Sequence, residues 1–317
     1  MSCDVTIVTA CDSKFVWGAT LLGLSLRYHG MSCPYNILGY DLSKQEVEIL
    51  QGIPNTKVFL THKSDNRSVC TQKPWAIATA ITNDIVWMDA DCIVSGNIES
   101  LLICPEGKLQ IRHRGKEENA SVFRNIYKKE DAVGEIPLEV LDRWRKDVND
   151  LNKSRLTYMC QTNCFVLNRN HLDFISLWQQ QMEKVIPLDT KGVYAKESKA
   201  YFMTDESVIN SLFAFSSKAP ETSEYLMDKS LDSACIHFGL NPKPWQHWTK
   251  QAYAYYDDIQ ALLNWARVQQ IKLPALTESL KPENRDKEYR RAKLLGIIRE
   301  LRYWVSSHIR RALRKVK

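Results

Sequence analysis

Several features that define whole protein classes are missing from this sequence. No run approaches the roughly 18–20 consecutive apolar residues that a membrane-spanning helix needs. The first residues include Asp4 rather than a basic cluster, so no secretory signal peptide is expected. No internal repeat or low-complexity tract is evident. What remains is a globular protein of ordinary composition, with 44% hydrophobic and 25% charged residues.

The nine cysteines form no recognisable metal or disulfide motif. They are scattered, odd in number and include no Cys-x-x-Cys pair. Cys160 and Cys164 lack a nearby partner set of the zinc type, and we expect them to be small buried residues. Cysteines that stay reduced favour a cytoplasmic location.

Positive charge is concentrated at the end of the chain. The 317 residues carry a net charge of +6, but residues 285–317 alone hold 12 Lys or Arg against 3 Asp or Glu. The rest of the chain is therefore slightly acidic. Pro274 and Pro282 punctuate the passage between the two parts. We predict one domain over residues 1–270, a linker over 271–284 and a basic tail over 285–317.

Short apolar runs alternate with helix-like spacings along the chain. Strands are predicted at residues 4–10, 35–40, 56–60, 85–89, 162–167 and 235–238, and helices at 14–28, 43–50, 74–81, 171–185 and 206–213. This order predicts an α/β protein with a mainly parallel sheet flanked by helices on both faces. Right-handed crossovers place the carboxyl ends of the strands on one edge, where such sheets bind ligands.

The pattern loosens between residues 105 and 160 into a charged segment. We predict an insertion here. It is either a lid or acceptor-binding region, or a solvated peripheral subdomain.

Two aspartates close the apolar run that begins at Asp84. Asp89-Ala90-Asp91 follows a predicted buried strand and precedes a break at Gly96. Carboxylates at a strand end suit Mg²⁺ or Mn²⁺, which keep open positions for phosphates and water. The spacing itself arises by chance about once in a chain of this composition, and a solvated turn would look the same.

A rarer segment lies far along the chain, at His237-Phe-Gly239-Leu-Asn-Pro-Lys243-Pro-Trp245. A neutral imidazole is an acceptable third ligand for Mn²⁺ beside two carboxylates. Gly239 would let the backbone approach a diphosphate closely, and Lys243 would supply a point charge to a phosphate oxygen. This combination indicates a metal and diphosphate site.

Five segments, in this order along the chain, resemble those of the family 8 glycosyltransferases. They are Thr9-Ala10-Cys11-Asp12, Met88-Asp89-Ala90-Asp91, Thr162-Asn163-Cys164-Phe165, Asp205-Glu206 with Asn210, and His237 with Lys243-Pro-Trp245. The resemblance covers roughly residues 4–250. It implies a GT-A (Rossmann-like) fold, a nucleotide-sugar donor that is commonly UDP-linked, and Mn²⁺ (or Mg²⁺). Many bacterial members build lipopolysaccharide or other surface glycans.

The resemblance also implies roles for individual residues. Asp89, Asp91 and His237 would hold the metal. The donor nucleotide sugar would be bound by Ala10, Asp12, Lys73, Asp89, Ala90, Asn163, Gly239 and Lys243. Asp205 and Glu206 would face the transferred sugar as catalytic residues. The family implies retention of configuration, so one of them is either a nucleophile or a stabiliser of an oxocarbenium-like centre.

Three positions depart from the family pattern. Phe165 stands where the family usually has glycine, Glu206 where it commonly has glutamine, and Gly239 one position earlier than expected. Donor specificity is the property that these changes affect most.

The basic tail has apolar residues at helical spacing, including Leu294, Leu301 and Trp304, among many arginines. An amphipathic helix of this kind suits an anionic membrane surface, which would make the protein peripheral on the inner face of the plasma membrane. A helix packed on the body, or one that binds a protein partner, has the same pattern.

The sequence therefore predicts a metal-dependent glycosyltransferase that moves a hexose from a nucleotide sugar to a glycan or lipid-linked acceptor in surface polysaccharide synthesis. The alternative is a catalytically degenerate, membrane-associated protein that binds nucleotide sugars. A sugar nucleotidyltransferase is disfavoured, because residues 9–14 contain no glycine-rich loop. Nucleic-acid binding is not expected, because the tail has no interleaved aromatic platforms and the body is acidic.

Overall fold

The computed structural model describes residues 4–62, 68–104, 107–127, 134–150, 153–188, 198–224 and 234–315. The chain divides into two compact units, Met1–Ile236 and His237–Lys317.

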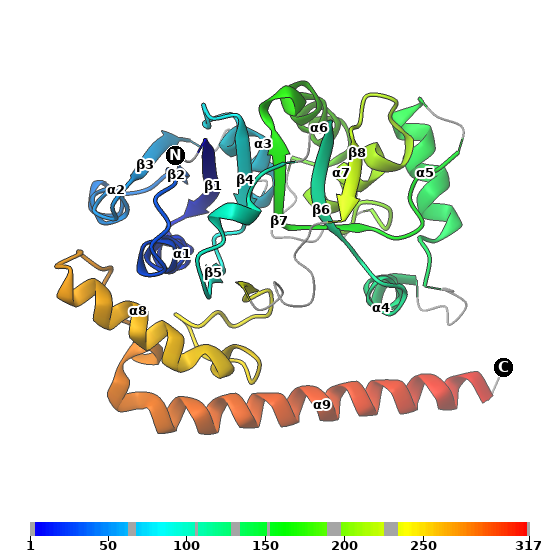
Figure 1. Ribbon diagram of the computed structural model, residues 1–317. Helices are drawn as coiled ribbons and strands as arrows, with labels where there is room; N and C mark the ends of the chain where they lie inside the picture. The colour runs from blue at the N-terminus through cyan, green and yellow to red at the C-terminus, as the bar shows by residue number, and fades with distance from the viewer. Residues whose placement is uncertain are drawn as a thin grey trace. The chain divides into compact units, whose positions relative to one another are not determined.

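The first unit is built on a seven-stranded sheet (Figure 1). Across the described part of the sheet the order is β3 (Thr56–Thr61), β2 (Tyr35–Tyr40), β1 (Val5–Asp12), β4 (Asp84–Met88), β7 (Cys160–Asn168), β6 (Lys108–His113) and β8 (Glu221–Glu224). β7 runs antiparallel to β4 and β6, whereas β1 with β2, β1 with β4, β2 with β3 and β6 with β8 pair in parallel. The predicted mainly parallel α/β fold is confirmed.

Helices cover both faces of this sheet. They are α1 (Val16–Tyr28), α2 (Lys44–Gln51), α3 (Lys73–Ile77), α4 (Lys116–Tyr127), α5 (Leu138–Val148), α6 (Leu172–Val185) and α7 (Thr204–Phe215). Most were predicted to within a few residues, but α3 ends at Ile77 and not at residue 81. α4, β6 and β8 were not predicted, and β6 lies inside the central sheet.

The core has two parts, one on each face of the sheet, because neighbouring residues of a strand point to opposite sides. Ile7 and Val86 belong to the cluster that α1 covers, whereas Val8 and Trp87 belong to the cluster shared with α6 and α7. Each central strand is therefore apolar on both faces, as expected of a parallel sheet enclosed by helices.

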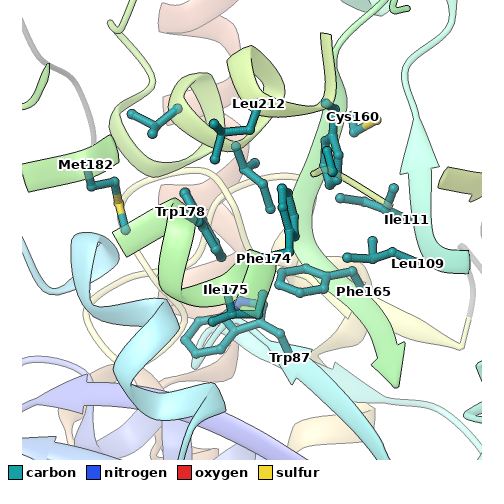
Figure 2. Packing of buried hydrophobic residues seen from close by; sticks show 14 of the residues in the cluster. Trp87, Leu109, Ile111, Cys160, Phe165, Phe174, Ile175, Trp178, Met182 and Leu212 are labelled. Carbon is teal, nitrogen blue, oxygen red and sulfur yellow. The ribbon is translucent and has the colours of Figure 1, made fainter. Parts of the chain in front are cut away.

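Phe165 lies in the second of these clusters (Figure 2). Its ring is fully buried and meets the Trp178 ring of α6 edge to face, with 6.2 Å between the ring centroids. At this position a glycine would leave part of the core unfilled. The phenylalanine therefore fills the core beneath the sheet.

β7 contains an irregularity on the side that faces β6. Ile111 is opposite Phe165, but the next residue, Arg112, is opposite Gln161. Thr162, Asn163 and Cys164 thus have no opposing residue on β6. A bulge of this kind re-aims side chains and is common beside active sites.

The second unit carries two helices, α8 (Tyr256–Val268) and α9 (Arg285–Lys315). α9 begins against its own unit, since Glu288 is almost fully buried and accepts a hydrogen bond from Arg291, 2.9 Å away. The side chains of α9 are described up to Val305, so the basic residues Arg310, Arg311, Arg314 and Lys315 lie outside the described side chains. The first part of the predicted tail is therefore part of a folded unit.

Replacing Phe165 with alanine should lower the free energy of unfolding by about 3–5 kcal/mol, because it removes a fully buried ring and leaves a cavity. Denaturant titration would measure the change. Ile81→Ala is the matched control, since that side chain is 79% exposed, and its effect should stay within about 0.5 kcal/mol. Equal effects of the two substitutions would contradict the packing of Phe165.

Candidate active site

The acidic pair lies in a tight turn at the carboxyl end of β4. β4 ends at Met88 and a short strand, β5 (Cys92–Val94), begins at once. The Cys92 amide donates to the Asp89 carbonyl at 3.0 Å, which closes the turn. The Asp89 amide donates to the carbonyl of Asn163 at 2.8 Å, so the β7 bulge holds the turn from the side. Ala90 and Asp91 are both buried there.

Lys73 is the central residue of this region. It is the first residue of α3 and is buried. Its Nζ lies 2.9 Å from Asp89 Oδ1 and 2.9 Å from Asp205 Oδ2. The same ammonium donates to the Thr162 carbonyl at 3.1 Å. The resemblance assigns Lys73 to donor binding, and in the structure its ammonium contacts Asp89, Asp205 and Thr162.

The environment of Lys73 keeps it charged. Burial by itself would lower the pKa of the ammonium, but the charges of Asp205 and Asp89 and their hydrogen bonds outweigh burial and raise the pKa above its ordinary value of 10.5. The ammonium also lies 5.2 Å from the centre of the Trp87 ring, whose Nε1 donates to Asp89 Oδ1 at 2.8 Å. The contribution of this charge to folding stability is therefore fully present at pH values below 10.5. It is lost as the pH rises from there through the raised pKa of Lys73 in the folded protein.

Asp205 and Glu206 lie in the first turn of α7 and are both buried. The positive end of a helix dipole favours carboxylates at this place. The helix begins at Thr204 with φ +42°, an unusual conformation for a β-branched residue. Asn210 ties α7 to β7, since its side chain bonds both the amide and the carbonyl of Cys160. The two acidic residues therefore have fixed positions beside the bulge.

Glu206 is held by Arg114 and Thr162. Arg114 Nη2 donates to one carboxylate oxygen, and the Thr162 amide donates to the other at 3.2 Å. Neither partner was predicted as a site residue. Arg114 was part of a charged stretch without a motif, so no local signal pointed to it, whereas Thr162 adjoins the predicted Asn163.

A group of possible metal ligands lies next to the acidic turn. Ligand atoms of Asp91, Cys92 and His237 lie within 4.8 Å of one another. His237 ends strand β9 (Cys235–His237), which pairs with β5. A carboxylate oxygen and an imidazole nitrogen are suitable donors for Mn²⁺ or Mg²⁺, so these residues fit a divalent ion. Among the described residues, this group does not include Asp89, which the sequence predicted as the third ligand. The Oδ1 atom of Asp89 contacts the Lys73 ammonium.

Solved structures that share this arrangement of strands and helices include glycosyltransferases. The bifunctional glycosyltransferase WbbM, in its apo form, matches with a TM-score of 0.52 and 15% identity over 90% of this chain. This chain spans about half of WbbM, 51% of its length. The galactosyltransferase LgtC, solved with donor and acceptor sugar analogs, matches with a TM-score of 0.51 and 13% identity over 85% of this chain and 98% of LgtC. The chain has the GT-A-type fold of glycosyltransferases. No protein-family model and no curated protein sequence matches it.

In this glycosyltransferase fold, Ala10 and Asp12 lie at the end of β1, next to β4 in the sheet. Asp12 Oδ1 accepts a hydrogen bond from the Lys14 amide at 3.0 Å, and the Asp12 carbonyl accepts one from Phe15. β1 and β4 run parallel, so both carboxyl ends lie on one edge. Asp12 and the acidic turn therefore share that edge, as expected from the order of strands.

Gly239 and Lys243 belong to the second unit. A Cβ at position 239 would lie 2.9 Å from Cε1 of His237, so a side chain there would push against the imidazole. Lys243 is buried, and its Nζ donates to the Phe238 carbonyl at 2.7 Å. The absence of a side chain at Gly239 therefore leaves room for the His237 ring.

Lys73→Met should lower the free energy of unfolding by about 3–5 kcal/mol, because it removes the cation from two carboxylates, of which Asp205 is buried. Denaturant titration would measure this loss. Lys108→Met is the control, since Lys108 forms an exposed ion pair with Glu221, 3.7 Å away, and little change is expected. A Lys73→Met protein as stable as the wild type would contradict the central role of this ammonium.

Proposed function

We propose that the protein is a metal-dependent glycosyltransferase that moves a hexose from a UDP-linked sugar to a glycan or lipid-linked acceptor. The observation that carries the proposal is the buried Lys73, bonded to Asp89 and Asp205 beside the group of Asp91, Cys92 and His237. This cluster lies at the carboxyl edge of the sheet, where open α/β folds bind nucleotides. The fold it shares with LgtC, a galactosyltransferase, supports a hexose as the transferred group.

The charges of the cluster favour a bound divalent cation. It comprises two cations and four carboxylates, namely Lys73, Arg114, Asp89, Asp91, Asp205 and Glu206. One divalent ion would balance the excess of negative charge. Such an ion, Mn²⁺ or Mg²⁺, would be held by Asp91 and His237 and would stabilise negative charge on the departing diphosphate.

The remaining residues would bind and orient the donor. Ala10 and Asp12 at the end of β1 would contact the nucleoside, and Gly239 with Lys243 the diphosphate. Asn163 on the β7 bulge would face the sugar together with Asp205 and Glu206. Lys73 holds Asp89 and Asp205 in place through its two ion pairs, so that these groups need not reorganise during transfer.

Retention of configuration and a role in surface polysaccharide or lipopolysaccharide synthesis form the finer part of this proposal. Both follow from the resemblance of the sequence segments. A protein that binds the nucleotide sugar but does not turn it over is the second candidate. Transfer or hydrolysis of the donor distinguishes the two.

Asp91→Asn should lower metal-dependent turnover at least about 100-fold, because an amide binds a divalent ion more weakly than a carboxylate while the side chain keeps its shape. The measurement is release of UDP from a panel of UDP-hexoses with and without Mn²⁺, combined with thermal stabilisation by each donor. Asp84→Asn, at the opposite end of β4, is the control and should retain activity. Unchanged turnover of Asp91→Asn would refute the metal assignment.

We also propose that α9 attaches the protein to the inner, anionic face of the plasma membrane. Six of its described apolar side chains repeat at helical spacing and are exposed; they are Leu294, Ile297, Ile298, Leu301, Trp304 and Val305. Arg299 and Arg302 lie among them, and the end of the helix is rich in arginine. Such a helix lies in the membrane interface. Within the described residues, no helix meets the length and hydropathy needed to cross a membrane.

Leu301→Gln with Trp304→Gln should reduce flotation with vesicles that contain phosphatidylserine, since the two apolar side chains are 56% and 57% exposed on α9. The charge of the helix stays the same. Leu138→Gln, another exposed apolar residue, is the control and should float like the wild type. Equal flotation of the double variant and the wild type would exclude this attachment.

A further inference from the structure

Arg114 is a buried cation that no motif explains. It follows β6, and its backbone amide donates to the Met159 carbonyl at 2.9 Å. Its side chain is 8% exposed and forms an ion pair with Glu206, whose side chain is 9% exposed. The Arg114 Nε has no hydrogen-bond partner among the described residues. Among the described residues, Glu206 is therefore the side chain that this guanidinium bonds.

The pair of Arg114 and Glu206 is linked to Lys73 through one residue of the β7 bulge. The Thr162 amide donates to Glu206 Oε2 at 3.2 Å, and the Thr162 carbonyl accepts from Lys73 Nζ at 3.1 Å. One peptide segment thus joins two buried ion pairs. A shift of Glu206 would move Thr162 and, through it, Lys73 and Asp89.

Both oxygens of the Glu206 carboxylate already accept hydrogen bonds from the protein. A nucleophilic carboxylate needs an oxygen directed at the sugar carbon, and pairing with a guanidinium withdraws electron density from it. The contacts of Glu206 are those of a group held in place by its neighbours.

We propose that Arg114 is a positioning residue of the transfer site, which acts by holding Glu206 against the Thr162 amide, and that Glu206 is not the nucleophile. This assignment rests on the proposed glycosyltransferase function. The ion pair also explains why a glutamate can stand where the family pattern has glutamine. A buried glutamate needs a positive partner, which Arg114 supplies, whereas a neutral glutamine would not need one.

The test compares Arg114→Gln, Glu206→Gln and the double variant in the full-length protein. Each single variant leaves one buried charge without its partner, so both proteins should melt at a lower temperature than the wild type. The residues of the site would also shift, and we expect kcat to fall about 100-fold. The KM for the donor should change less. The double variant removes both charges and keeps an amide oxygen for the Thr162 amide. We expect its kcat to return to within about tenfold of the wild type.

A second single variant covers the case in which Arg114→Gln does not fold. Arg114→Lys keeps the positive charge with a different shape, and partial activity is expected. Arg285→Gln is the control, because Arg285 forms an exposed ion pair with Asp257, 2.9 Å away, and kcat and KM should not change.

Three results would overturn the assignment in distinguishable ways. A double variant as inactive as Glu206→Gln, yet as stable as the wild type, would mean that Glu206 acts on the sugar directly. If Arg114→Gln lowers the melting temperature but keeps the kcat and KM of the wild type, Arg114 has only a structural role. A wild-type protein that neither transfers nor hydrolyses any nucleotide sugar would overturn the proposed function and this assignment with it.

Discussion

The buried ammonium of Lys73 is the contact on which the rest of the site depends. Removing a lysine from water is costly, and the cost is offset only because Asp89, Asp205 and the Thr162 carbonyl surround it. These partners come from the end of β4, the start of α7 and the β7 bulge. One charge therefore brings three distant parts of the chain together at the edge of the sheet.

The bulge in β7 explains how a regular sheet supports such a cluster. A strand in full register with β6 would direct successive side chains alternately into the two hydrophobic cores. Three residues without opposing partners interrupt this alternation, so the backbone of Thr162 and Asn163 bonds Lys73, Glu206 and Asp89. The flanking residues return to the core, as Phe165 does beside Trp178. Irregular backbone is thus confined to the segment that contacts the site.

The two departures from the family pattern in this region have different physical meanings. Phe165 is buried beneath the sheet and fills space between β7 and α6. Glu206 lies at the edge and is accompanied by Arg114, which balances its charge. The first change concerns packing. The second concerns electrostatics, and it requires a compensating residue about ninety positions earlier in the chain.

The sequence alone determined the alternation of strands and helices, the mainly parallel sheet and the acidic turn at its edge, because these depend on local periodicity and on which residues end a strand. It also predicted the amphipathic α9 from spacing. The positions of β6 and β8 in the sheet, the central place of Lys73 and the pairing of Arg114 with Glu206 were decided only by the tertiary structure. These contacts join residues far apart in the chain, and they depend on the register of β7 against β6 and on the cost of burying a charge without a partner. Neither quantity can be read from a local pattern.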